Sequence, residues 1–241
     1  MRLLLLLVLL PYSLLAQASN FKLGIGHDLE PIMANLIAQF EPEAGHSITL
    51  VSAPGSTLEQ QAKAGELDML LAPDARVPSL LESQGLIRSG SRQTYAIGQL
   101  WLWTPRTSHP QPGTLQQLSS LAMVNPKLDA YGRAGQNLLQ SLSRWPWQRG
   151  QLLQTFDSPT AKRMAASGQV EGALLPASLL LLQGIPLNQV LIIPPGYYQP
   201  LEQQLVILKA SSQQALAERL SAYLRSEPVQ RQLADFGYLQ P

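Results

Sequence analysis

The stretch FKLGIGHDLEPIMANLIAQF, residues 21–40, decides the fold. Its first five residues, Phe21 to Ile25, are apolar-rich and predict a strand. The rest predicts a helix, because apolar side chains recur at intervals of three and four and so form one helical face over three turns. These are Leu29, Ile32, Met33, Leu36, Ile37 and Phe40. Residues 21–40 therefore form a strand, a short loop and a helix, with Gly24-Ile25-Gly26-His27-Asp28 at the junction.

The same alternation continues along the chain on both sides of a break near Gly98. Before the break we expect strands at 48–51 and 67–71 and helices at 57–64 and 77–84. After it we expect strands at 99–104, 121–124, 152–156, 172–175 and 204–208, and helices at 132–142, 159–166, 215–224 and 228–236. Alternation with short connections is typical of parallel βαβ units. The fold class is therefore α/β, with mixed sheets flanked by helices.

Two breaks in the pattern indicate two lobes. One lies at Gly98, and the other at Pro194-Pro195-Gly196, each beside a predicted strand. A single continuous domain is permitted by length alone, but we favour two crossovers between two lobes. Lobe 1 would then hold residues 19–97 and 204–241 and lobe 2 residues 98–203, with hinges near 98–103 and 195–203.

The N-terminus has the pattern of a secretory signal peptide over residues 1–18. Arg2 supplies the positive charge, Leu3 to Leu10 form an apolar run, and Ala16-Gln17-Ala18 offers small residues at a cleavage site. The run is much shorter than a membrane-spanning helix needs. No cysteine follows it, so attachment of a lipid to cysteine is excluded. We expect a secreted, periplasmic protein.

The mature chain has a balanced charge. Without Arg2 it carries 16 Lys and Arg against 16 Asp and Glu, and no cysteine. Balanced charge without a basic run argues against nucleic acid and anionic membrane surfaces as partners. The lack of cysteine rules out disulfides and thiolate metal sites.

Four strand-to-helix junctions carry residues that suit a ligand. They are Gly24 to Asp28, Pro54-Gly55-Ser56-Thr57, Asp129-Ala130-Tyr131-Gly132 and Asp157-Ser158-Pro159. Helix N-termini at the ends of parallel strands attract anions. We expect Asp28 to cap the first helix and Ser158 to cap the helix at 159–166. Each junction alone also fits an ordinary helix cap, but two of them fall in each lobe, as a ligand held between lobes requires.

Patterns for catalysis are missing from the sequence. His27, His46 and His109 are scattered without a metal-ligand spacing on one helix. There is no Gly-x-Ser-x-Gly elbow, and Gly24-x-Gly26 lacks the third glycine of a phosphate-binding loop. Neighbouring His27 and Asp28 generally point apart, so they do not predict an acid–base pair. We expect no enzyme, no catalytic residue, no cofactor and no metal ligand.

The mature chain resembles the periplasmic molybdate-binding proteins of ABC importers. The resemblance is carried by an ordered series of motifs, each of low specificity alone. The series runs from the strand-loop-helix of residues 23–40, through Gly55-Ser56-Thr57-Leu58 and Asp68-Met69-Leu70-Leu71-Ala72-Pro73-Asp74, to Asn125-Pro126-Lys127 with Tyr131-Gly132-Arg133-Ala134, Ser167-Gly168 with Gly172, and Phe236-Gly237-Tyr238.

This resemblance implies a class II solute-binding fold that closes on a tetrahedral oxyanion such as molybdate. It implies an ABC permease in the inner membrane as partner, and we expect a monomer. By position, the ligand contacts would be His27, Asp28, Gly55, Ser56, Tyr131, Ser158 and Leu175. The family has serines where this chain has His27-Asp28, and often a tyrosine at the position of Leu175.

Asp28 leaves three interpretations open, because a carboxylate in a dry pocket would repel a dianion. Asp28 caps its helix and faces away, or a protonated His27 offsets its charge, or the ligand is not an oxyanion. We therefore expect His27-Asp28 to decide ligand choice. Arg133, at the start of the helix at 132–142, either reaches the anion or is a surface charge.

Two alternative functions remain compatible with the sequence. The same fold could bind another solute, or the protein could be a periplasmic sensor or accessory protein that binds a protein partner. Four tryptophans would serve such a partner if they were exposed, although packing in the core or hinge is the simpler interpretation. They are Trp101, Trp103, Trp145 and Trp147.

The signal peptide makes a first prediction: the mature protein begins at Ser19, because Ala16-Gln17-Ala18 precedes it. N-terminal sequencing of periplasmic material checks this. An intact Met1, or protein found only in the cytoplasm, contradicts it.

Overall fold

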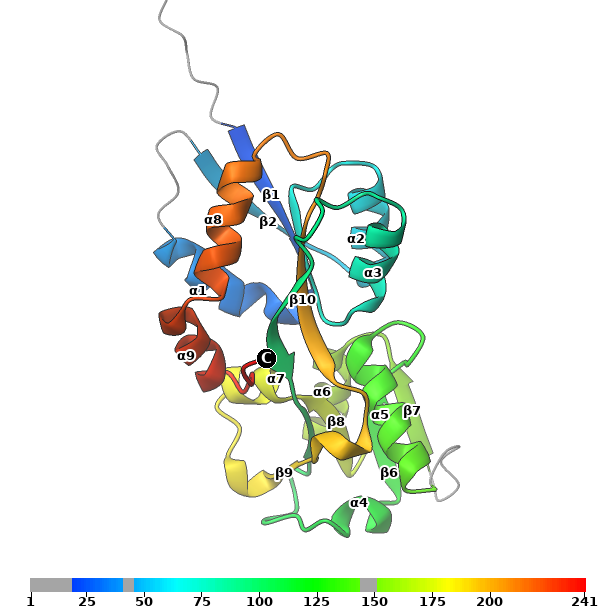
Figure 1. Cartoon of the computed structure of the whole chain (residues 1–241). Coiled ribbons are helices and arrows are strands. Elements are labelled where there is room, and N and C mark those ends of the chain that lie inside the picture. Colours follow the sequence, from blue (N-terminus) through cyan, green and yellow to red (C-terminus); the bar gives the residue numbers. More distant parts are fainter. Residues whose placement is uncertain (1–18, 41–45, 144–150) are drawn as a thin grey trace, which may run out of the picture.

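The computed structural model describes residues 19–40, 46–143 and 151–241. In this part of the chain two five-stranded sheets lie one above the other, each with helices packed against it (Figure 1). The predicted α/β class with two lobes is confirmed. The predicted signal peptide, residues 1–18, lies outside the described residues. Within those residues, no helix has both the length and the apolar character needed to cross a membrane.

The first sheet has the strand order β2-β1-β3-β10-β4. Strands β1, β2 and β3 run parallel, and β10 runs antiparallel to both β3 and β4. Helices α1, α8 and α9 cover one face and α2 and α3 the other (Figure 1). The bounds are β1 Ser19–Ile25, β2 His46–Ser52, β3 Met69–Ala72, β4 Gln93–Gly98, β10 Leu201–Ile207, α1 Glu30–Gln39, α2 Gly55–Lys63, α3 Arg76–Ser83, α8 Gln214–Leu224 and α9 Glu227–Asp235.

The second sheet has the order β7-β6-β8-β5-β9. Strand β6 pairs in parallel with β7 and β8, and β5 pairs antiparallel with β8 and β9. Its elements are β5 Leu100–Trp103, β6 Ser120–Val124, β7 Gln151–Thr155, β8 Gly172–Pro176, β9 Val190–Ile192, α4 Thr114–Gln117, α5 Ala130–Ser141, α6 Ser158–Ser167 and α7 Ala177–Leu182. Three short 3-10 turns complete the fold: η1 His27–Leu29, η2 Leu187–Gln189 and η3 Pro195–Tyr197.

The chain passes between the sheets at Gln99, where β4 ends and β5 begins, and returns through η3 into β10. The strand expected over 99–104 is confirmed as β5, and the strand β4, which ends just before Gln99, was not expected. All four residues of β5 are buried, because helices cover both faces of the second sheet. The lobe limits and the hinges are defined by a motion, and they stay a prediction.

Each face of each sheet carries its own apolar cluster. The periodic residues of 29–40 pack against β1, β3 and α8 in the largest of them. Trp101 and Trp103 are 5% and 4% exposed and belong to a cluster in the second sheet, so for these two the core interpretation is confirmed. Trp145 and Trp147 lie outside the described residues.

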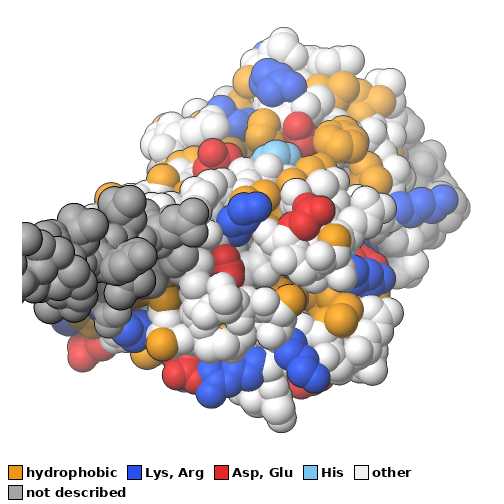
Figure 2. Space-filling model, turned by 90° about the horizontal axis from the view of Figure 1, so that it is seen from above, with side chains coloured by type: hydrophobic (Ala, Val, Ile, Leu, Met, Phe, Trp, Pro, Cys, Tyr) orange, Lys and Arg blue, Asp and Glu red, His pale blue; other side chains and the backbone are white. Residues whose placement is uncertain are grey.

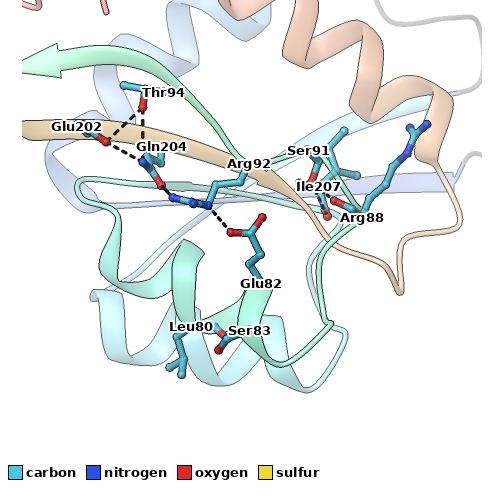
Figure 3. A network of polar contacts seen from close by, with 10 residues as sticks. All are labelled: Leu80, Glu82, Ser83, Arg88, Ser91, Arg92, Thr94, Glu202, Gln204 and Ile207. Carbon is cyan, nitrogen blue, oxygen red and sulfur yellow. Dashed lines mark hydrogen bonds and ion pairs between the residues drawn. The ribbon is translucent and has the colours of Figure 1, made fainter.

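A polar network ties β4 and β10 to α3 (Figure 3). Arg92 Nε donates to Glu82 Oε2 at 2.6 Å, and its Nη1 donates to Gln204 Oε1 at 3.3 Å. Gln204 Nε2 in turn donates to Glu202 Oε2 at 2.8 Å. The network holds the returning strand β10 in register beside β4, where the pairing shifts between Gln203 and Gln204.

Gly132 allows helix α5 to begin directly against the end of β6. A Cβ atom there would lie 2.6 Å from the carbonyl oxygen of Val124 and 2.9 Å from that of Asn125. Both neighbours are backbone atoms and cannot rotate away, so the helix itself would have to move.

We therefore predict that Gly132→Ala lowers the free energy of unfolding by about 1–3 kcal/mol, the usual cost of overpacking. Chemical denaturation of both forms measures this. Gly196→Ala is the matched control, since a Cβ there meets nothing within 4 Å. Equal stability of Gly132→Ala and wild type would show that α5 can shift without cost.

Candidate functional site

The candidate site lies where the two sheets face each other. Strands β1, β2 and β3 lead into helices at the edge of the first sheet that faces the second, and β6 and β7 lead into α5 and α6 at the opposing edge (Figure 1). An ion pair between Arg133 in α5 and Asp74 after β3 connects the two edges. Asp28 interacts electrostatically with Asp129 and Asp157, and Ile25 at the end of β1 pairs with Ser52 at the end of β2. The four predicted junctions therefore lie at these facing edges, and we call the region between the edges the gap.

At the first junction the predicted cap, Asp28, is wrong. Asp28 caps neither η1 nor α1: those elements have Gly26 and Leu29 at their N-caps, and neither cap makes a side-chain hydrogen bond. The chain enters the 3-10 turn η1 first, which places Asp28 inside a turn instead of before a helix. Its carboxylate is half-buried, and its own backbone N–H lowers its pKa. The neighbouring His27 is exposed, and its Nδ1 lies 2.8 Å from Ser52 Oγ.

The second junction offers backbone donors. Helix α2 begins at Gly55, and the N–H groups of Thr57 and Leu58 already bond to the carbonyl of Pro54. The N–H groups of Gly55 and Ser56 therefore stay without a partner within the described chain. The Ser56 side chain is exposed beside them.

The third junction is built on Asp129, which caps α5. Its Oδ1 accepts from the N–H groups of Tyr131 at 2.7 Å and Gly132 at 3.2 Å. Tyr131 is buried, and its hydroxyl lies 2.5 Å from where a Cβ on Gly98 would stand. The phenol of Tyr131 thus reaches the point where the chain leaves the first sheet, and only a glycine leaves room for it there.

At the fourth junction the predicted cap, Ser158, is wrong. The cap of α6 is Asp157, whose Oδ1 accepts from Thr160 N–H at 2.7 Å, and Ser158 is the first helical residue. Asp157 is the cap because it stands one residue before the helix with an extended backbone, from which its carboxylate can accept a bond from an N–H of the first turn. Ser158 is 6% exposed, yet no hydrogen bond within the described chain uses its hydroxyl.

Leu175 lies in β8 with its side chain fully buried in an apolar cluster with Trp101 and Ala161. The structure gives it a packing role. Its contact with a ligand stays a prediction that nothing in the geometry supports.

Three carboxyl groups interact across the gap. Burial raises the pKa of Asp28, and the negative charge of Asp157 raises it further, against the lowering effect of the Asp28 N–H. Burial and the charge of Asp28 raise the pKa of Asp129 from 3.8 to about 6, although the N–H groups of its cap and Arg133 oppose this. Buried like charges disfavour each other's ionisation.

Three tyrosines lie with these acids. Tyr95 in β4, Tyr131 in α5 and Tyr238 near the C-terminus are all buried, and the pKa of each is raised, mainly by burial. Each of the three also interacts electrostatically with Asp28. The hydroxyl of Tyr95 has no hydrogen-bond partner within the described part of the chain, whereas that of Tyr238 donates to Ser178 Oγ at 3.5 Å.

Sequence reasoning missed Tyr95 and Tyr238 as neighbours of the site. They come from the last strand in the order of the first sheet, β4, and from the chain end, which only the antiparallel return of β10 and the course of α9 bring to this site. Two surface grooves lie elsewhere. One of about 570 Å³ is lined by Glu82, Arg88 and Lys209 among others, and one of about 330 Å³ by Asn137, Gln140 and Tyr198 among others. Neither groove includes a predicted ligand contact.

The charged side chains elsewhere are mixed in sign. On the face in Figure 2, Lys and Arg alternate with Asp and Glu over the surface. Among the described residues, no three His, Cys, Asp or Glu side chains are grouped so that they could hold a metal ion. The chemistry available at the gap is therefore that of hydrogen-bond donors, hydroxyl groups and carboxyl groups.

Comparison with known sequences identifies the class. The profile of the bacterial extracellular solute-binding proteins matches residues 21–239, so the chain belongs to this family. Two characterised relatives are the molybdate-binding protein ModA of Azotobacter vinelandii and that of Rhodobacter capsulatus. The first is 27% identical over 229 residues, 92% of this chain and 91% of the relative. The second is 25% identical over 206 residues, 84% and 81% of the two chains.

A solved structure supports the same relationship. The periplasmic molybdate-binding protein of Azotobacter vinelandii superposes with a TM-score of 0.79 at 25% identity, covering 92% of this chain and 99% of that one. The predicted class II two-lobed solute-binding fold is therefore confirmed. The family is one of binding proteins and not of enzymes.

The raised pKa of Asp129 makes a prediction for stability. Between pH 3.8 and about 6 the native protein holds a proton on Asp129 that the unfolded chain has lost. The free energy of unfolding therefore falls as pH rises through this window. Asp129→Asn keeps a good helix cap and removes the charge. We expect it to gain about 2 kcal/mol relative to wild type between pH 4 and pH 7.

Urea unfolding of the ligand-free forms at the two pH values checks this. A difference between variant and wild type that is the same at both would contradict it.

Proposed function

We propose that this protein is the periplasmic binding component of an ABC importer and that it binds a tetrahedral oxyanion of the molybdate type. The observation that carries the proposal is the pair of unused donor sets on opposing edges of the gap. The N–H groups of Gly55 and Ser56, at the start of α2, have no partner within the described chain. The hydroxyl of Ser158, at the start of α6, has none there either. The ligand named for both relatives, molybdate, agrees with donors of this kind.

Neutral donors suit a small dianion for a physical reason. Backbone N–H groups at a helix N-terminus carry a partial positive charge and point along the axis toward the ligand. They need no counter-ion of their own, and the bound anion satisfies their hydrogen-bonding capacity when water is excluded between two lobes. The hydroxyl of Ser158 adds a donor from the second sheet, and the ligand would then bridge both lobes.

Arg133 is better explained as a link between lobes than as a ligand contact. Its guanidinium pairs with Asp74 and also donates to the carbonyl of Pro126 at 3.3 Å. A charge that is already paired contributes little to a new anion. The same pair would help to hold the lobes together when they close over a ligand.

The location and partners follow from the same proposal. The predicted signal peptide would deliver the protein to the periplasm as a monomer, and closure around the ligand near residues 98–103 and 195–203 would present both lobes to a permease in the inner membrane. Tyr131 stands at the first of these crossovers, beside Gly98.

Calorimetric titration with molybdate, tungstate, sulfate and phosphate tests the proposal. We predict tight binding of molybdate or tungstate, and about tenfold weaker binding by Ser158→Ala, equivalent to ~1.4 kcal/mol for one lost hydrogen bond to a charged group. Ser167→Ala, at the other end of α6, is the matched control, because the Ser167 hydroxyl already donates to the carbonyl of Met164 at 3.0 Å.

Wild-type protein that binds none of the four anions would refute the proposed function. Equal weakening by both serine variants would refute the contact assigned to Ser158.

A further inference from the structure

Asp28 lies at the first junction of the proposed site, and its carboxyl group does not serve as a helix cap. It caps neither η1 nor α1, since neither N-cap makes a side-chain hydrogen bond. The acids that face it are differently placed. Asp129 accepts from two helix N–H groups and Asp157 from one, so both carboxylates are committed to their caps. Of these three groups, Asp28 is the one free to change its bonding when a ligand arrives.

The groups around Asp28 make its charge costly. Asp157 faces it from α6 and Asp129 from α5, both as like charges. Tyr95 in β4, Tyr131 in α5 and Tyr238 at the chain end also interact electrostatically with it, and their phenol groups are not cations. The cation on α5, Arg133, is paired with Asp74, and on its own turn the exposed His27 bonds to Ser52. A dianion would add two more negative charges to this environment.

A carboxylate and a fully ionised tetrahedral oxyanion are both acceptors, so no hydrogen bond can form between them. A single proton on the carboxyl group removes this conflict between two acceptors. A neutral carboxyl group has an O–H that donates to a ligand oxygen, and such a bond to a charged acceptor is among the stronger ones. Burial next to like charges favours the neutral form in advance.

We propose, on the basis of the oxyanion function above, that Asp28 binds the ligand as a neutral carboxyl group and that a proton is taken up from solvent onto Asp28 when the dianion enters. The carboxylate gains one proton, the O–H donates to a ligand oxygen, and the ligand stays a dianion. Asp28 is then a ligand-binding residue that makes anion capture depend on pH.

The proposal makes the affinity for a dianion depend on pH with a defined slope. Where Asp28 is already neutral in the free protein, the dissociation constant is flat. Above the pKa of Asp28 in the free protein, binding must include protonation, and the dissociation constant rises about tenfold per pH unit. Asp28→Asn replaces the O–H by an N–H donor of similar shape that cannot titrate, so its dissociation constant should stay flat.

The test is calorimetry with molybdate, which is fully ionised near neutral pH, in pairs of buffers with different ionisation enthalpies at acidic, neutral and alkaline pH. For wild type we expect proton uptake that rises toward about one per molybdate at the alkaline end, and for Asp28→Asn none at any pH. Glu30→Gln is the matched control, since Glu30 is an exposed acid two residues away at the start of α1. Asp129→Asn should keep the uptake but move its onset to lower pH values, because the loss of a like charge lowers the pKa of Asp28 in the free protein.

Several results would overturn the inference and leave the proposed function intact. They are flat binding by wild type with no proton uptake, uptake that disappears in Asp129→Asn but not in Asp28→Asn, and molybdate binding by Asp28→Asn but not by wild type at any pH. Failure of every form to bind any of the four anions would instead refute the proposed function, and the inference with it. Binding of a cation in place of an anion would have the same meaning.

Discussion

Parallel strand pairing is the constraint on which the site depends. Because β1 pairs in parallel with β2 and β3, the helices that follow them start at one edge of the first sheet. The pairing of β6 with β7 and β8 does the same for the second sheet. The polypeptide changes sheets at Gln99, and this turns the two edges toward each other. Helix N-termini that lie far apart in sequence therefore meet at one gap, where their free N–H groups are available to a ligand.

The same arrangement concentrates negative charge. A helix N-terminus favours an Asp at its cap, so two junctions bring Asp129 and Asp157 to the gap as part of their folding. These carboxylates are satisfied by the N–H groups they cap. Asp28 caps no helix, and its charge interacts with both Asp129 and Asp157. A site that offers donors to an anion thus also contains one acid whose charge opposes the anion, and protonation is the simplest way in which both features can serve one ligand.

The limits of sequence reasoning are visible at particular residues. Asp28 stands immediately before the apolar period begins, which is where a cap belongs, and the pattern could not show that a 3-10 turn would intervene. Asp157 and Ser158 are both good caps, and only the backbone geometry decides between them. Leu175 was carried over by position, but it faces the core because both faces of the second sheet are covered. Strand β4 was not predicted, because buried and half-buried residues are mixed along it and give no regular alternation of apolar and polar side chains.

What the sequence determined by itself was the class of fold and the set of junctions. Apolar periodicity specifies helices and strands locally, and glycine, proline and capping residues mark their ends, so residues 21–40 and the later units could be predicted without coordinates. The tertiary structure alone decided which side chains share the gap. Tyr95, Tyr131 and Tyr238 join Asp28 there through long-range strand pairing and the return of the chain end. Such contacts depend on sheet order and crossovers, and a local pattern contains no information about either.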